Sequence, residues 1–126
     1  MAGVGIEEGG TIDATSEHAL DFTLDVNLKG PMRFARACVP LMRAQGGGSI
    51  VNIASQLAIS ARHGMPVYIG SKGGVAAFSR ALAIDHAPDS IRCNSICPVR
   101  PATDLRSVWR RHCLLTRGMS CGRASS

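Results

Sequence analysis

The chain has 126 residues, of which 45% are hydrophobic, 18% are charged and 4% are aromatic. These proportions are typical of one small globular domain, and they exclude a disordered or a fibrous protein. Fourteen glycines beside so few aromatic residues favour a fold with close backbone contacts around a core of Ala, Val, Ile and Leu.

The net charge of +5 comes entirely from the C-terminal part of the chain. Residues 1–104 contain nine basic and nine acidic residues, whereas residues 105–126 add five arginines and no carboxylate. A nucleic-acid-binding domain usually carries its basic patch on the folded body, so we do not expect nucleic acid as a partner. We predict a domain over 1–104 and a basic tail over 105–126. The tail is either a short amphipathic helix that binds an anionic surface or a disordered extension. A change of reading frame or of splicing could also have produced such an extension.

The five cysteines follow no regular spacing, and the first ten residues lack the basic and apolar parts of a secretion signal. We therefore expect free thiols in a cytoplasmic protein. The longest uncharged stretch, residues 44–61, contains glycines, serines and amides, which argues against a membrane span. The four histidines match no metal-ligand spacing, so we expect no metal.

Apolar periodicity predicts a helix, a strand, a helix and a strand, in that order. Residues 3–14 are glycine-rich and turn-like, and Thr15 or Ser16 marks the start of a helix over 16–44. Gly30-Pro31 predicts a kink or a break within this helix. The remaining elements are a buried strand over 49–55, a helix over 67–86 and a strand over 91–97 that Pro98 ends. This alternation predicts parallel strands, in a two-stranded sheet with two bare edges.

Nucleotide-binding glycine loops of the G-x-G-x-x-G and G-x-x-x-x-G-K types do not occur, but one pair of residues suits acid/base chemistry. Tyr68 lies four residues before Lys72, and one helical turn would stack the ammonium beside the phenol. That charge would lower the Tyr68 pKa from its ordinary value of about 10. Ser55 ends the first strand, where open α/β sheets bind ligands, and its hydroxyl could converge with that of Tyr68 on one carbonyl oxygen. The pair alone equally fits an exposed helix face.

Together with their surroundings, these residues resemble the short-chain dehydrogenases/reductases. The resemblance rests on five segments, which are Ala2 to Gly5, Val26 to Gly30, Gly48 to Ser55, Tyr68 to Gly73, and Ile91 to Asn94 leading to Cys97-Pro98. It implies an α/β fold, namely a partial Rossmann-like, doubly wound parallel sheet whose first β-α-β half is missing. Residues 1–104 would then be the catalytic half of such a domain.

The resemblance implies an NAD(P)-dependent oxidoreductase that interconverts alcohols and ketones, with Tyr68 as the acid/base. Ser55 would orient the substrate oxygen, Lys72 would lower the Tyr68 pKa and hold the nicotinamide ribose, and Asn27 would support a water that relays protons to Lys72. Taken alone, Asn27 equally fits a cap on a carbonyl freed near Gly30-Pro31. The implied cofactor-binding residues are Ala2, Gly3, Tyr68, Lys72, Pro98 and Thr103. The family's Pro-Gly reads Pro98-Val99 here.

Because the dinucleotide-binding half would be missing, we expect the chain alone to be inactive or impaired. The alternative is a non-catalytic dimerisation module. In the family, the helices that correspond to residues 16–44 and 67–86 form the main dimer interface, which implies a homo-oligomer or pairing with a full-length relative. A third hypothesis, binding of nucleic acid or anionic lipid through the tail, is supported only by the five tail arginines.

Overall fold

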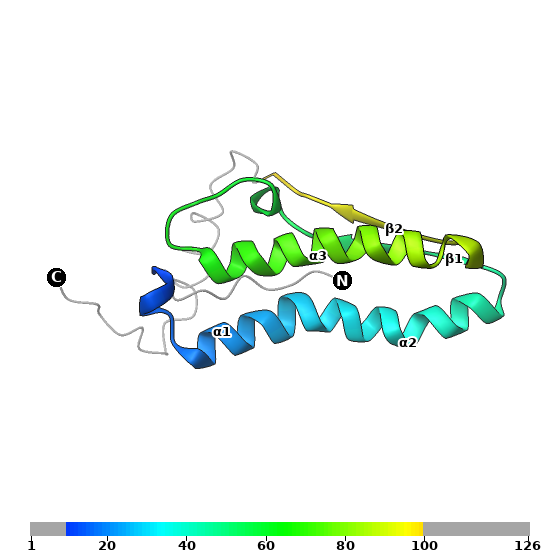
Figure 1. Ribbon diagram of the computed structural model, residues 1–126, viewed down its shortest axis with the longest axis horizontal. Helices are drawn as coiled ribbons and strands as arrows, with labels where there is room; N and C mark the ends of the chain where they lie inside the picture. The colour runs from blue at the N-terminus through cyan, green and yellow to red at the C-terminus, as the bar shows by residue number, and fades with distance from the viewer. Residues whose placement is uncertain (1–9, 100–126) are drawn as a thin grey trace, which may run out of the picture.

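The computed structural model describes residues 10–99, which form a layer of helices packed on a parallel sheet (Figure 1). The main helices are α1 (Glu17–Leu24), α2 (Gly30–Ala44) and α3 (Pro66–Asp85). Strands β1 (Gly48–Ile53) and β2 (Ile91–Ile96) pair in parallel, with Gly48 opposite Ile91 and Ile53 opposite Ile96. The order of elements confirms the predicted helix, strand, helix and strand of a partial Rossmann-like α/β fold.

The first long helix contains one widened turn. Of the two predicted start residues, Ser16 forms the cap, since its hydroxyl accepts a hydrogen bond from the Ala19 N–H at 3.2 Å. Between α1 and α2, Asp25–Lys29 forms a π turn, η2, in which the Gly30 N–H donates to the Asp25 carbonyl. Pro31 has no N–H, and in a regular α-helix its ring would clash with the carbonyl four residues earlier. The predicted kink near Gly30-Pro31 is therefore a π turn just before the proline.

The turn from α2 into β1 depends on Gly47. This residue has a φ of +141°, and a Cβ placed on it would lie 2.7 Å from the Ser90 carbonyl oxygen. No side chain is accommodated there, because both the conformation and the space favour glycine. Gly47 thus lets the beginning of β1 approach the beginning of β2.

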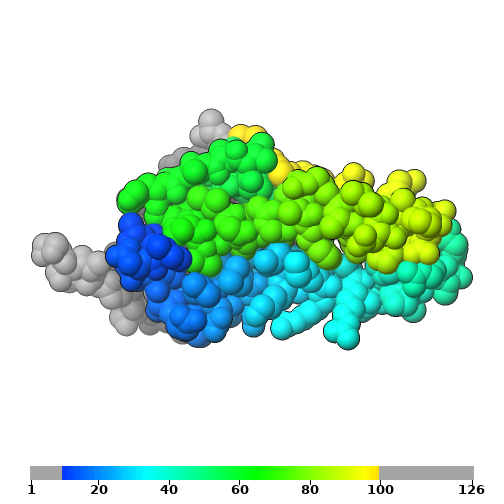
Figure 2. All heavy atoms as spheres, in the orientation of Figure 1, coloured from blue at the N-terminus to red at the C-terminus, as the bar shows by residue number. Residues whose placement is uncertain are grey.

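The core lies between the sheet and the helices, on one face of the sheet. It is built from two clusters of buried residues. All the main elements except α1 contribute to the larger one, which contains Ala35, Val39, Ile50, Leu82, Ile91 and Cys93, and the smaller one contains Ala54, Val75 and Ala76. The first helix and α3 run side by side in the same direction and form two ridges (Figures 1 and 2). In the described part of the chain, Ser49, Val51, Arg92, Asn94 and Ile96 are exposed on the other face. As predicted, the sheet formed by residues 10–99 has two strands and two edges that no other described strand covers.

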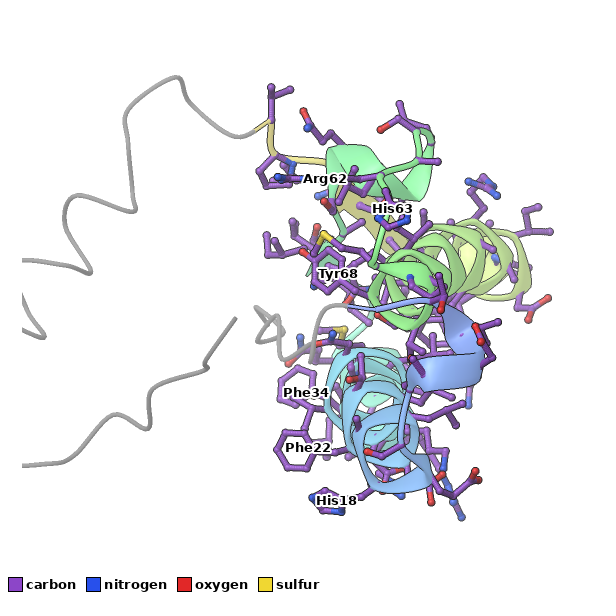
Figure 3. The ribbon with its side chains drawn as sticks, turned by 90° about the vertical axis from the view of Figure 1, so that its left-hand side faces the viewer. His18, Phe22, Phe34, Arg62, His63 and Tyr68 are labelled. Carbon is purple, nitrogen blue, oxygen red and sulfur yellow. The ribbon has the colours of Figure 1, made fainter. Side chains whose placement is uncertain are left out.

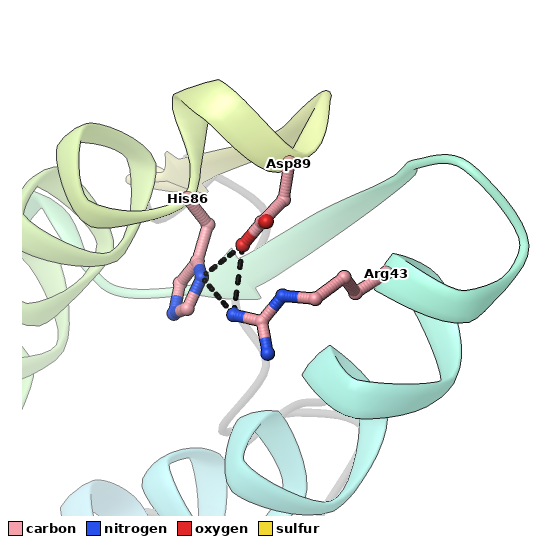
Figure 4. A network of polar contacts seen from close by, with 3 residues as sticks. All are labelled: Arg43, His86 and Asp89. Carbon is pink, nitrogen blue, oxygen red and sulfur yellow. Dashed lines mark hydrogen bonds and ion pairs between the residues drawn. The ribbon is translucent and has the colours of Figure 1, made fainter.

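The C-terminal ends of α2 and α3 are joined by a polar cluster (Figure 4). The Arg43 guanidinium donates to the Asp89 carboxylate at 2.8 Å, and His86 Nδ1 lies 2.9 Å from the same oxygen. The Arg43 hydrogen bond, followed by that of His86, lowers the pKa of Asp89 from 3.8 to about 2. This cluster lies at the end of the molecule opposite to the carboxyl ends of the strands (Figure 1).

We expect the contribution of Asp89 to stability to disappear in acid. A carboxyl group whose pKa is lower in the folded chain stabilises the fold above its unfolded pKa of 3.8, and the effect is lost as the pH falls through about 2. An Asp89→Asn variant should therefore unfold at lower urea concentration than the wild type at pH 7, and this gap should close near pH 2. The exposed Asp85 offers a matched control through Asp85→Asn. An equal gap at both pH values would contradict the prediction.

Some predicted features lie outside the described residues, among them the basic tail over 105–126. Within residues 10–99, no helix combines the length and the apolar character needed to cross a membrane. The same residues contain no group of three His, Cys, Asp or Glu side chains that would hold a metal. The cytoplasmic location stays a prediction.

Candidate active site

The predicted site residues gather where the two strands end. Ser55 follows β1, Pro98 follows β2, and Tyr68 and Lys72 lie in the first two turns of α3, which begin at the same end of the molecule (Figure 1). Figure 3 views this end and shows the Tyr68 ring beneath the loop that carries Arg62 and His63. A parallel pair of strands brings these residues together because its carboxyl ends share one edge of the fold.

Lys72 is buried and is held by the end of β1. Lys72 is only 2% exposed, and its Nζ donates to the Ile53 carbonyl oxygen at 3.0 Å. The same nitrogen lies 5.9 Å from the centroid of the Tyr68 ring. Burial lowers the pKa of Lys72, because the charged form loses its hydration. The predicted juxtaposition of the phenol and the ammonium is therefore present on α3.

Asn27 lies in the π turn and reaches α3 through Ser71. Asn27 is fully buried, and its Nδ2 donates to Ser71 Oγ at 3.3 Å. Ser71 Oγ in turn donates to the Tyr68 carbonyl oxygen at 2.7 Å. The Asn27 amide thus bonds to α3 and does not cap a carbonyl near Gly30-Pro31. Its Oδ1 is buried and has no hydrogen-bond partner within residues 10–99.

Ser55 caps the short turn that follows it. Its Oγ accepts from the Leu57 N–H at 3.2 Å, at the start of the 3-10 turn Gln56–Ala58. In the described structure, the side chains of Ser55 and Tyr68 do not hydrogen-bond to each other. Both residues are partly exposed. The structure therefore places both residues at the strand ends, while the convergence of their hydroxyls on one substrate oxygen stays a prediction.

Ser71 was not among the predicted site residues, although the sequence contains a signal for it. Positions 67, 71, 75, 79 and 82 form the buried stripe of α3 and carry Val67, Ser71, Val75, Ser79 and Leu82. A polar residue on such a stripe needs a buried hydrogen-bond partner. The two serines therefore mark points where α3 bonds to a neighbouring element.

The described residues fit the nicotinamide end of a dinucleotide cofactor. An ammonium has three donors, and that of Lys72 uses one on Ile53, so two are available for ribose hydroxyls. A dinucleotide also needs backbone donors for its pyrophosphate. Residues 10–99 contain no glycine-rich turn from a strand into a helix that would supply them. The predicted cofactor residues Ala2, Gly3 and Thr103 lie outside the described residues, and Pro98 is exposed just after β2.

This arrangement defines an α/β protein whose polar site lies at the carboxyl ends of parallel strands. The sequence of residues 1–113 matches the short chain dehydrogenase family. The chain therefore belongs to the short-chain dehydrogenase/reductase family.

Curated relatives support the same assignment. The chain is 38% identical over 106 residues to 2-(R)-hydroxypropyl-CoM dehydrogenase of Xanthobacter autotrophicus, a match that covers 84% of this chain and 42% of the relative. It is 39% identical over 101 residues to human dehydrogenase/reductase SDR family member 4, with 79% of this chain and 36% of the relative covered. An uncharacterized oxidoreductase of Thermotoga maritima is 39% identical over 94 residues, which are 75% of this chain and 38% of the relative. The chain thus spans less than half the length of these oxidoreductases.

Proposed function

We propose that this chain carries the proton-transfer site of an NAD(P)-dependent oxidoreductase that interconverts alcohols and ketones. The observation that carries the proposal is the pair on α3, in which the buried Lys72 ammonium lies 5.9 Å from the Tyr68 ring centroid. The family's oxidoreductase class, shared with the relatives above, supports it. Residues 1–104 would form this catalytic part of the domain.

In this proposal, Tyr68 and Ser55 act on the substrate oxygen. Within residues 10–99 the phenol of Tyr68 makes no hydrogen bond, so it is available to donate a proton to a ketone or to accept one from an alcohol. Because the Ser55 oxygen already accepts from Leu57, its own proton is available for the same substrate oxygen. The nicotinamide cofactor, when bound, supplies or accepts the hydride.

Lys72 and Asn27 support that step. The Lys72 ammonium provides a positive charge beside the anion that Tyr68 leaves after donating its proton. Its remaining N–H groups would bind the nicotinamide ribose. The buried Asn27 Oδ1 has no partner within residues 10–99, and we propose that a water there passes protons toward Lys72. Pro98 would border the cofactor from the end of β2.

The test is a comparison of whole and half cofactors by isothermal titration. Because the described residues would contact only the nicotinamide end of the cofactor and include no pyrophosphate cradle, we expect weak binding and an impaired chain. Reduced nicotinamide mononucleotide should then bind almost as well as NADH and NADPH, and all three should lose affinity in Lys72→Met but not in Lys29→Met. Absence of binding by all three at millimolar concentration would contradict the proposed function.

A second candidate function, a dimerisation module, is favoured by the surface of the first helix. Three apolar side chains, Phe22, Phe34 and Leu41, are 41%, 51% and 69% exposed, and the first two project from the same side (Figure 3). Charge is also segregated along this helix. The part up to residue 25 carries Glu17, Asp21 and Asp25, and the part from residue 29 onward carries Lys29, Arg33, Arg36 and Arg43. An antiparallel partner helix from a second copy, or from a full-length relative, would meet opposite charges.

This second candidate predicts a salt-sensitive dimer that a charge exchange restores. In sedimentation equilibrium, Asp21→Lys and Arg33→Asp should each weaken self-association, because each places like charges across the antiparallel pair. The double variant carries both reversals in each copy and should associate as well as the wild type. A protein that stays monomeric at high micromolar concentration, or a double variant weaker than both single ones, would contradict it.

A further inference from the structure

Two buried hydrogen-bond relays of the same design connect α3 to its neighbours. In the first, Asn27 Nδ2 donates to Ser71 Oγ at 3.3 Å and Ser71 Oγ donates to the Tyr68 carbonyl at 2.7 Å. In the second, Asn52 Nδ2 donates to Ser79 Oγ at 2.9 Å and Ser79 Oγ donates to the Val75 carbonyl at 2.8 Å. All four side chains are nearly inaccessible, with exposed fractions of 0%, 0%, 4% and 1% for Asn27, Ser71, Asn52 and Ser79.

The two relays differ in what they hold. Ser79 lies eight residues after Ser71, so the second relay connects the middle of α3 to β1. The first relay connects η2 to the turn of α3 that carries Tyr68 and Lys72. Ser71 lies directly before Lys72, and its acceptor is the peptide carbonyl of Tyr68 itself. The first relay therefore acts on the segment that presents the proposed acid/base, and the second does not.

Apolar packing alone specifies the rotation of this part of α3 poorly. The helix has Gly70, Gly73 and Gly74 around Lys72, and a Cβ on Gly74 would lie 2.9 Å from the Leu28 side chain. The Leu28 side chain thus packs directly on the Gly74 backbone, and the three glycines of α3 present no side chains of their own that would interlock with η2. A rotation or a slide of the helix would break the Asn27–Ser71 hydrogen bond and leave the buried Asn27 amide without that partner, which is costly. The hydrogen bond between Asn27 and Ser71, more than apolar packing, therefore defines the orientation of this part of α3.

We propose that Ser71 is a positioning residue, which uses its bond to Asn27 to fix the turn of α3 on which Tyr68 and Lys72 face the substrate site. The proposal rests on the proposed function for its chemical purpose, but its geometry is measurable without turnover. Ser71 touches neither substrate nor cofactor in this account. It acts through the Tyr68 peptide and through the register that lets Lys72 reach the Ile53 carbonyl.

The experiment compares Ser71→Ala with Ser79→Ala, which removes the same kind of relay two turns away. The chain has one tyrosine and two lysines, so NMR of protein labelled with ¹³C-lysine and ¹³C-tyrosine gives resolvable signals, with the exposed Lys29 as an internal reference. In Ser71→Ala we expect loss of the nuclear Overhauser contact between the Lys72 side chain and Ile53, because a shifted α3 would no longer bring Nζ to the Ile53 carbonyl. The Lys72 titration midpoint should also rise, because the ammonium regains water. In Ser79→Ala both signals should stay as in the wild type, although the urea midpoint falls.

Ser71→Cys, which keeps the volume and a weak donor, should restore part of the contact. If Ser71→Ala does not fold, a measurement on the wild type still tests the proposal. The hydroxyl proton of Ser71 should exchange slowly and show a contact to the Asn27 amide, and its absence would overturn the proposal. Equal changes in the two alanine variants, or unchanged Lys72 signals in Ser71→Ala, would also overturn it. Failure of cofactor binding with these NMR results intact would instead reject the proposed function alone.

Discussion

Replacing Tyr68 with Phe is expected to lower the rate of ketone reduction by a factor of about 10² to 10⁴, because the substitution removes the proton donor and nothing else. Within residues 10–99 the phenol oxygen makes no hydrogen bond, so the ring should keep its place and the urea midpoint should stay unchanged. The measurement is the single-turnover oxidation of NADH in the presence of a small ketone at saturating cofactor. Cofactor affinity should change by less than about twofold, since the lost group acts mainly in the transition state.

The matched control for this prediction is Ser60→Ala. Ser60 is exposed on the loop after β1 and donates only to the Gln56 carbonyl, so its loss should leave the rate unchanged. A Tyr68→Phe protein that keeps more than a tenth of the wild-type rate would show that the proton comes from another group.

Replacing Lys72 with Met should strongly reduce turnover while leaving the fold as stable as the wild type at pH 7, or more stable. Burial of the ammonium is unfavourable, and it is offset by a single hydrogen bond to Ile53 within the described residues. A thioether of similar length fills the space without that cost. The rate should fall by at least about 100-fold, since the positive charge beside the Tyr68 anion is lost. Such a gain in stability with a loss of function is typical of side chains retained for chemistry.

The lowered pKa of Lys72 also predicts the direction in which the free energy of unfolding changes with pH. The pKa of Lys72 is lower in the folded chain than its ordinary 10.5, so the folded state binds fewer protons at this group. Wild-type stability should therefore rise with pH across the interval between the two values, and this rise should be absent in Lys72→Met. Urea unfolding at pH 7 and near pH 10 measures it. Lys29→Met, which removes only the exposed pair with Asp25, is the control and should retain the rise.

Local features of the fold are readable from the sequence because they depend on neighbouring residues. The cap at Ser16, the strand after the glycines at 46–48 and the long helix that begins at Pro66 follow from spacing, turn residues and β-branched runs. The Tyr68 and Lys72 pair is equally local, since one helical turn separates the two. The π turn was predicted only as a kink, because several distortions relieve the same proline.

Contacts between residues far apart in the chain could not be predicted from the sequence. Asn27 and Ser71 are 44 positions apart, and their hydrogen bond depends on how closely η2 approaches α3. The acceptor of Lys72 is a main-chain carbonyl, a group that every residue carries and that no side-chain pattern singles out. Ser71 nevertheless falls on the buried stripe of α3. That mismatch indicates that a partner exists, without indicating which one.

The single strand pairing divides the peptide groups of the sheet into two classes. The amides of Gly48 and Ala54 donate across to the carbonyls of Ser90 and Ile96, so in both strands the peptide N–H and C=O groups of the even-numbered residues point toward the other strand. The amides of Cys93 and Ser95 point toward the edge that no described strand covers. Deuterium should enter these two amides quickly and their neighbours in sequence slowly. Along six residues of one strand, the rate of isotope uptake would then alternate like the pleat itself.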